Sequence, residues 1–256
     1  MKIVIPMSGL GSRFVAAGYQ DIKPLIKVFN KPIIEWVVSM FSPEDEFIFI
    51  CRDEHLNSTN LKDELSRIKP SAKIVSIKGH KKGPVYAVTK IADLIKDDEP
   101  IIVSYCDYYM HWDYQQFQKD VKKNNCAGAI PCYTGFHPNL LPKENLYASC
   151  LIDENNFLKE IREKHSFTKD KAQSLHSPGL YYFSNGASIK KYFQMMLDQD
   201  INLNGEYYVS LVYNLMVAAG LSIYVPANVS HFCQWGTPHD LEEFVYWVNL
   251  VRGVKK

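Results

Sequence analysis

The sequence opens with MKIVIPMSGLGSR, residues 1–13, and this stretch decides the fold. Residues 2–6 are almost entirely apolar, which is typical of a strand buried on both faces. The run leads directly into MSGLGSR, a turn of small residues that ends in Arg13. Such a turn offers backbone N–H groups to a polyphosphate, and its glycines let the backbone approach closely. The stretch therefore predicts a strand that ends in a phosphate-binding loop.

A second cation follows at Lys23-Pro24, ten residues after Arg13. Arg13 and Lys23 together could neutralise the charge of a triphosphate. The loop is not the dinucleotide fingerprint, because Phe14 stands where that motif needs its third small residue, and the sequence has no Walker A motif. We therefore expect a nucleoside triphosphate to be bound by a group of residues near the amino terminus: Met7, Ser8, Gly9, Leu10, Gly11, Ser12, Arg13 and Lys23.

The bulk composition is that of an ordinary globular protein. The chain has 256 residues, of which 46% are hydrophobic and 22% charged, enough for one large α/β domain over residues 1–256. The net charge of +1 disfavours nucleic acid and anionic membranes as partners, since both attract a basic field. If phosphate is bound, a few local cations must supply the positive potential.

The cellular compartment is predicted from what the sequence lacks. No apolar stretch is as long as a membrane span, and a strand that starts at Lys2 leaves no room for a signal peptide. The six cysteines form no CxxC pair, which disfavours a zinc site and favours reduced, mostly buried thiols. We expect a cytoplasmic protein.

Strand-like and helix-like stretches alternate through the first half of the chain. The strand-like runs are 2–6, 46–51, 72–77 and 101–105, and the helix-like stretches are 32–41, 54–68 and 84–95. This alternation predicts a largely parallel sheet with helices on both faces. Ligands bind beyond the carboxyl ends of such strands, so the loop at 8–13 and Asp107 should share one crevice.

The second half of the chain has a different pattern. Strand-like runs follow one another without helices between them, and long helical patterns come last: strands at 126–132, 146–152, 157–163 and 179–184, and helices at 187–199, 207–219 and 238–250. The change predicts two halves, 1–125 and 126–256, built on one continuous sheet.

Asp107 follows the buried run 101–105 and is a candidate metal ligand. A hard oxygen ligand at a strand end that faces a triphosphate suits Mg²⁺. The alternative is a turn aspartate that accepts backbone hydrogen bonds. Asp113 is better explained as the N-cap of a helix at 114–124 than as a second metal ligand.

The glycine-rich loop ending in Arg13, followed by Lys23-Pro24, resembles the signature of the sugar-phosphate nucleotidylyltransferases, the pyrophosphorylases that make nucleotide sugars. The resemblance extends over most of the chain, in the small single-domain form found in surface-polysaccharide (capsule) pathways. It implies a Rossmann-like (GT-A-like) three-layer αβα domain. The central sheet would be mixed but mostly parallel, with a smaller β-rich acceptor-binding part.

The resemblance also implies roles for residues of the first half, which would bind the nucleotide. Arg13 and Lys23 would hold the triphosphate and stabilise the transition state at the α-phosphate, and Asp107 would hold the catalytic Mg²⁺. The segment 80–87, HKKGPVYA, resembles the family's base-recognition segment, with Gly83 and Lys82 as the candidates. The alternative for this segment is an exposed basic turn that caps a helix.

The second half would bind the phosphorylated acceptor. Glu163 and Lys164 resemble a family Glu-Lys pair that meets acceptor hydroxyls and phosphate, although adjacent charges on an exposed strand end would look the same. Gly179 belongs to a segment in which Ser177 replaces the family's asparagine, and Glu206 is a further candidate for hydroxyls.

One position departs from the family. Many members have Trp-x-Asp-x-Gly-Thr near the end, with the aspartate as a second metal ligand, whereas this chain has Gln234 there. A neutral amide is a poor second ligand for Mg²⁺. Either Asp107 and the phosphates suffice, or the metal is held with a different geometry.

The predicted reaction joins an NTP to a sugar or polyol phosphate and releases pyrophosphate, with Mg²⁺ as cofactor. CTP is favoured by resemblance to small cytidylyltransferases, and UTP, dTTP and GTP stay open. The alternatives are a GT-A-type glycosyltransferase, although Asp107-Tyr108-Tyr109 lacks the second aspartate of Asp-x-Asp, and a non-catalytic nucleotide-sugar-binding relative, which Gln234 favours. A homo-oligomer is also left open, because the aromatic-rich residues 105–114 suit an interface or a core.

Overall fold

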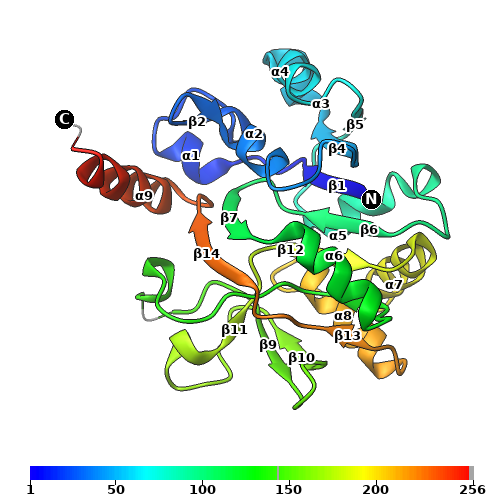
Figure 1. The fold of residues 1–256 in the computed structure, drawn as a ribbon. Coiled ribbons are helices and arrows are strands. Elements are labelled where there is room, and N and C mark those ends of the chain that lie inside the picture. Colours follow the sequence, from blue (N-terminus) through cyan, green and yellow to red (C-terminus); the bar gives the residue numbers. More distant parts are fainter. Residues whose placement is uncertain (143, 254–256) are drawn as a thin grey trace.

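A computed structural model describes residues 1–142 and 144–253 of the chain, around a central seven-stranded sheet (Figure 1). The strand order is β13-β8-β12-β6-β1-β4-β5. These strands are β1 (Lys2–Met7), β4 (Glu46–Arg52), β5 (Lys73–Ile77), β6 (Ile101–Ser104), β8 (Gly128–Ala129), β12 (Leu180–Phe183) and β13 (Ile223–Tyr224). β1, β4, β5 and β6 run parallel, and β12 is antiparallel to both β6 and β8. The expected mixed, mostly parallel sheet is confirmed.

Helices cover both faces of this sheet. The helices of the described chain are α1 (Ser12–Ala16), α2 (Ile33–Val38), α3 (Asp53–Ser58), α4 (Leu61–Ile68), α5 (Gly83–Thr89), α6 (Tyr114–Lys123), α7 (Gly186–Asp198), α8 (Val209–Ala218) and α9 (Pro238–Val251). Of these, α9 extends from the end of β14 away from the central sheet (Figure 1). Because side chains alternate along a strand, Ile3 and Ile5 of β1 enter one core with α2, α4 and α6, whereas Val4 enters the other with α5, α7 and α8. This arrangement is the expected three-layer α/β fold.

Smaller sheets complete the molecule. β9 (Ser149–Ile152), β10 (Leu158–Arg162) and β11 (Leu175–His176) form an antiparallel sheet, which lies below the central sheet in Figure 1. β2 (Lys27–Val28) pairs with β3 (Lys31–Pro32), and β7 (Tyr108–Trp112) pairs with β14 (Val229–Gln234). The β7–β14 pair was not predicted, and it matters for the site because its register aligns Gln234 with Tyr108, next to Asp107.

Some expected elements are shorter than predicted. The single helix expected over 54–68 is two helices, α3 and α4. The break comes at Thr59, which has an extended backbone conformation and whose hydroxyl accepts the N–H of Leu61. The strand expected over 126–132 is regular only in β8. Asp113 is the N-cap of α6, as predicted, and its carboxylate accepts the N–H of Gln116 at 2.8 Å.

The described chain agrees with the prediction of free thiols. All six cysteines lie in the described ranges and are free thiols, with Cys51, Cys126, Cys132 and Cys150 buried. Within residues 1–142 and 144–253, no helix combines the length and apolarity that a membrane span requires.

Candidate active site

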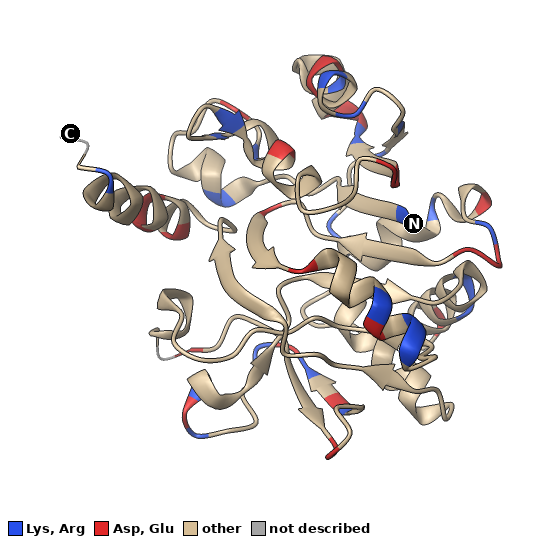
Figure 2. Cartoon of the chain, in the orientation of Figure 1, with Lys and Arg blue, Asp and Glu red and all other residues tan. Residues whose placement is uncertain are grey.

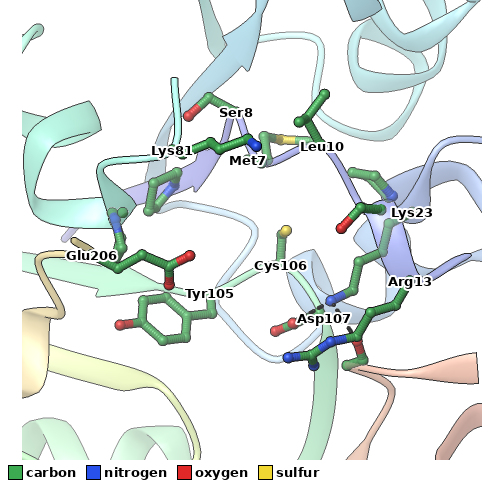
Figure 3. Close-up of a pocket in the computed structure, with 18 of the residues that line it drawn as sticks. Met7, Ser8, Leu10, Arg13, Lys23, Lys81, Tyr105, Cys106, Asp107 and Glu206 are labelled. Atoms are coloured by element: carbon green, nitrogen blue, oxygen red, sulfur yellow. Dashed lines mark hydrogen bonds and ion pairs between the residues drawn. The ribbon is translucent and has the colours of Figure 1, made fainter. Parts of the chain in front are cut away.

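A cavity of about 490 Å³ opens at the carboxyl ends of β1 and β6 (Figure 3). Its wall combines the glycine loop, the start of α5, the residues after β6 and three residues from the second half of the chain. The lining residues are Pro6, Met7, Ser8, Gly9, Leu10, Gly11, Ser12, Arg13, Phe14, Lys23, Pro24, His80, Lys81, Gly83, Pro84, Tyr105, Cys106, Asp107, Glu206, Tyr208 and Gly236. The crevice predicted between the loop and Asp107 is therefore present.

The glycine loop is shaped by Gly11. Its φ of 64° lies in the left-handed region, and a Cβ there would stand 3.3 Å from the Cβ of Lys23. Glycine thus lets the loop turn into α1 while it packs against the segment that carries Lys23. Around Gly9, by contrast, no atom of the described chain lies within 4 Å of the position of a Cβ. That side of the loop is free to receive a ligand.

Lys23 and Asp107 form the central ion pair of the cavity. Lys23 Nζ donates to Asp107 Oδ2 at 2.6 Å and to the carbonyl oxygen of Gly236 at 3.0 Å. Lys23 begins a short 3-10 helix, Lys23–Leu25, and Pro24 at its second position restricts the backbone there. Figure 3 shows the guanidinium of Arg13 directed into the same space. Two cations and one carboxylate thus converge on one cavity.

Charge elsewhere on the molecule is mixed. Figure 2 shows Lys and Arg interspersed with Asp and Glu over most elements, in keeping with the net charge of +1. The positive potential for an anionic ligand therefore comes from the cations of the cavity, namely Arg13, Lys23 and Lys81.

The cavity wall also contains a cysteine, Cys106, directly before Asp107. Burial, reinforced by the charge of Asp107, raises the pKa of the Cys106 thiol to about 12. The thiol is therefore protonated at neutral pH, and a thiol is a much weaker nucleophile than a thiolate. Cys106 therefore forms part of the cavity wall and does not act as a nucleophile.

Gln234 lies beside the Asp107 carboxylate. Both side chains border Gly236, where a Cβ would stand 2.4 Å from Gln234 Nε2 and 3.5 Å from Asp107 Oδ2. No group of three or more His, Cys, Asp or Glu side chains in the described ranges could hold a metal ion. The Asp107 carboxylate is an oxygen donor of the kind that Mg²⁺ prefers, and it fits an ion that takes its remaining ligands from phosphate oxygens and water.

Gly83 lets the start of α5 lie against the segment before α8. Its φ is 81°, and a Cβ would stand 2.8 Å from the backbone nitrogen of Tyr207. Two backbone hydrogen bonds hold this contact, from Tyr207 N–H to the Lys82 carbonyl at 3.0 Å and from Val85 N–H to the Tyr207 carbonyl at 3.2 Å. The predicted base-recognition segment therefore joins the two halves of the chain.

We expect Gly83→Ala to lower the free energy of unfolding by about 1–3 kcal/mol, because it adds left-handed strain and a backbone clash. Gly18→Ala is the matched control, since Gly18 has a φ of 85° but no atom of the described chain within 4 Å of a Cβ. Urea unfolding of both variants measures the difference. Equal losses would contradict the close contact at Tyr207.

Lys82, which was expected to bind the nucleotide, lies outside the cavity lining. Its ammonium is 4.9 Å from the centre of the Tyr86 ring, and Lys81 lines the cavity in its place. Neighbouring residues in a turn point in different directions, and the sequence pattern does not distinguish them. All other residues predicted to bind nucleotide line the cavity.

Of the predicted acceptor residues, Glu206 lines the cavity and the other three lie outside the lining. Glu163 accepts a hydrogen bond from Ser210 of α8, and burial raises the pKa of its carboxyl despite that bond. Lys164, with a φ of 52°, is exposed. Gly179 packs closely against the ring of Tyr105, which lines the cavity, since a Cβ at Gly179 would stand 2.8 Å from that ring.

Two tyrosines that were not predicted line the cavity together with Glu206. Tyr105 follows β6, and Tyr208 donates its hydroxyl hydrogen to Glu206 Oε2 at 2.6 Å. Ser177, which replaces the family's asparagine, accepts the N–H of Gly179 at 3.2 Å and so is engaged within its own turn. The sequence signal for Tyr208 was its position two residues after Glu206.

Comparison with known proteins agrees with this geometry. Residues 2–204 match the sequence profile of the nucleotidyl transferase family. No curated protein matches the chain in sequence. Several solved structures share its fold at low identity.

A nucleoside-diphosphate-sugar pyrophosphorylase from Vibrio cholerae RC9 is 19% identical, with a TM-score of 0.76 over 95% of this chain and 99% of that one. An inositol-1-phosphate CTP transferase from T. maritima is 14% identical, with a TM-score of 0.72 over 100% of this chain and 98% of that one. A UDP-glucose pyrophosphorylase in complex with UDP-glucose is 15% identical, with a TM-score of 0.72 over 98% of this chain and 99% of that one.

The profile match covers most of the chain, and the fold and the strand-end cavity agree with it. As its glycine loop, Arg13 and Lys23 predicted, this protein belongs to the nucleotidyl transferase family.

Proposed function

We propose that the protein condenses an NTP with a sugar or polyol phosphate to give a nucleotide sugar and pyrophosphate. The observation that carries the proposal is the convergence of Arg13, Lys23 and Asp107 on one cavity beside the glycine loop. In the reaction, an oxygen of the acceptor phosphate attacks the α-phosphorus of the NTP. The bond from the α-phosphorus to the bridging oxygen breaks, and pyrophosphate leaves with the electron pair.

This reaction needs no side-chain nucleophile. The second pKa of a phosphomonoester is about 6, so the attacking oxygen is already anionic at neutral pH. The main task of the protein is to bring two anions together in line and to neutralise their charge. Arg13 and Lys23 are placed to do so, and each charge-assisted contact would contribute about 1.5–3 kcal/mol.

Asp107 would hold Mg²⁺ through its carboxylate, near Gly236, which the Gln234 side chain also borders. The bound ion would supply Lewis-acid stabilisation of charge on the phosphate oxygens. The ion pair with Lys23 engages Oδ2 of Asp107, so the carboxylate could hold the ion through Oδ1 while Lys23 stays beside the phosphates.

CTP is the favoured nucleotide. Its support is the compact form of the chain and the overall likeness to an inositol-1-phosphate CTP transferase. We place the reaction in the cytoplasm, in nucleotide-sugar synthesis for a surface polysaccharide such as a capsule. Glu206, Tyr208 and Tyr105 would meet the hydroxyls of the acceptor.

The test is a matrix of CTP, UTP, dTTP and GTP against a panel of sugar and polyol phosphates with Mg²⁺, followed by pyrophosphate release. We expect release only when one NTP and one acceptor are both present. Nucleotide binding without pyrophosphate release for every acceptor would instead select a non-catalytic nucleotide-sugar-binding protein, the alternative that Gln234 favours.

A further inference from the structure

Ser8 of the glycine loop and His80 of the loop before α5 are joined by a hydrogen bond. Ser8 Oγ lies 3.1 Å from His80 Nε2, and the other ring nitrogen, Nδ1, accepts the N–H of Lys82 at 3.1 Å. Both Ser8 and His80 line the cavity. The imidazole ring thus bridges the loop predicted to bind phosphates and the loop predicted to recognise the base.

A buried arginine contacts both loops that this bridge joins. Arg52, at the end of β4, is 8% exposed, and its Nη1 donates to the Ser8 carbonyl oxygen at 3.4 Å. Its guanidinium also fills the space beside Gly79, where a Cβ would stand 2.0 Å from Nη2. The two loops therefore pack on one fixed group, and the position of each depends on the other.

The hydrogen bonds determine which nitrogen of His80 carries the proton. Because Nδ1 accepts from Lys82, the neutral ring has its proton on Nε2 and donates it to Ser8 Oγ. The Ser8 oxygen is then an acceptor toward His80, so its own hydrogen is available to an oxygen or nitrogen of a ligand in the cavity. The bond to His80 thus orients the Ser8 hydroxyl so that it can donate a hydrogen bond to a ligand in the cavity.

The surroundings of His80 favour its neutral form. Burial, with the charges of Arg52, Lys82 and Lys90, lowers the pKa of His80 below the ordinary 6.5. These cations face the ring from β4, from its own loop and from the end of α5, and the Tyr86 ring packs against it at 4.8 Å. The bond from Lys82 is fully present above pH 6.5 and is lost as the pH falls through this lowered pKa, since a protonated Nδ1 cannot accept.

We propose that His80 is a positioning residue for the nucleotide, which aims the Ser8 hydroxyl at the NTP and fixes the phosphate loop relative to the base loop. The proposal rests on the proposed function, because it takes an NTP as the ligand. It assigns His80 to nucleotide binding rather than to the chemical step. Loss of the bridge should therefore raise the KM for the NTP and leave kcat within a few-fold.

The discriminating variant is His80→Asn. An asparagine Oδ1 can still accept the N–H of Lys82, two residues on, but its side chain is too short to reach Ser8. We expect the Kd and KM for the nucleotide to rise about tenfold, the effect of one lost hydrogen bond. Ser8→Ala should give a rise at least as large, because it removes both the bond to His80 and the hydroxyl that would contact the nucleotide. The double variant should show no further rise beyond that of Ser8→Ala.

The pH profile is the second readout. In the wild type, the KM for the nucleotide should rise as the pH falls below 6.5, and in His80→Asn this rise should disappear. His111→Asn is the matched control, because His111 is exposed and lies outside the cavity lining. Its pH profile should equal that of the wild type.

The measurement is calorimetric titration with Mg–CTP, and with Mg–UTP, Mg–dTTP and Mg–GTP in parallel, together with pyrophosphate-release kinetics. If His80→Asn keeps the Kd and the pH profile of the wild type while pyrophosphate release persists, the role of His80 is refuted and the proposed function stands. If the wild type binds none of the four nucleotides, both fail.

Discussion

Lys23→Ala is expected to lower turnover by about 10²–10³-fold, the loss typical of removing one preorganised donor to a charged transition state. The Lys23 ammonium lies 2.6 Å from Asp107 Oδ2 in the cavity, within reach of the same space as Arg13. Alanine leaves the reacting phosphates without that cation and Asp107 without its partner. Arg13→Ala should have an effect of the same order, because its guanidinium faces the same cavity.

Lys27→Ala is the matched control for these variants. Lys27 lies on β2, four residues from Lys23, is exposed and stands outside the cavity lining, so the same unit of charge is removed elsewhere. Its turnover should be close to that of the wild type. Circular dichroism and thermal unfolding check that all three variants fold. Near-normal pyrophosphate release by both Lys23→Ala and Arg13→Ala would remove the active-site assignment.

The second large effect is expected at Asp107. Asp107→Asn should lower Mg²⁺-dependent turnover on the order of 10³-fold, since a bound metal contributes several kcal/mol of charge stabilisation. Mn²⁺ in place of Mg²⁺ allows binding itself to be followed by electron paramagnetic resonance. Asp107→Asn should lose the Mn²⁺ that the wild type binds together with the NTP.

Gln234→Asp tests the same metal site by adding a carboxylate instead of removing one. In the nucleotide-free wild type, Asp107 is paired with Lys23 and its neighbour is a neutral amide, so Mn²⁺ should bind weakly. A second carboxylate at 234 should tighten this nucleotide-free binding about tenfold or more, whereas Gln234→Asn should not. Tight binding of Mn²⁺ to the wild type without nucleotide would contradict the single-carboxylate site.

The meeting of the residues expected to bind the nucleotide in one cavity could be predicted because it depends on local order along the chain. A buried strand such as β1 or β6 ends where its apolar run ends, and parallel strands bring their carboxyl ends to one edge of the sheet. Arg13 and Asp107 follow two such neighbouring strands, so their meeting needed no long-range information. Gly83 was predictable for a similar reason, since it stands directly before Pro84 at the start of a helix.

The positions of the residues expected to bind the acceptor depend on contacts between distant segments. Tyr105 is positioned by Gly179, and Glu163 is held by Ser210, 47 residues further along the chain. A pair of adjacent charges such as Glu163 and Lys164 has the same pattern whether it faces a ligand, a neighbouring helix or water. The division into a nucleotide half at 1–125 and an acceptor half at 126–256 stays a prediction.

The central claim is that one cavity, with Arg13, Lys23 and Asp107 in its wall, transfers the nucleotidyl group of an NTP to a phosphorylated acceptor. The most direct test follows the label from α-³²P and γ-³²P nucleotide in parallel, in the wild type and in Lys23→Ala. We predict that the α-label enters the nucleotide sugar and the γ-label enters pyrophosphate, and that both products fall together in the variant. Transfer of the γ-label to the acceptor, or its release as inorganic phosphate, would contradict the account.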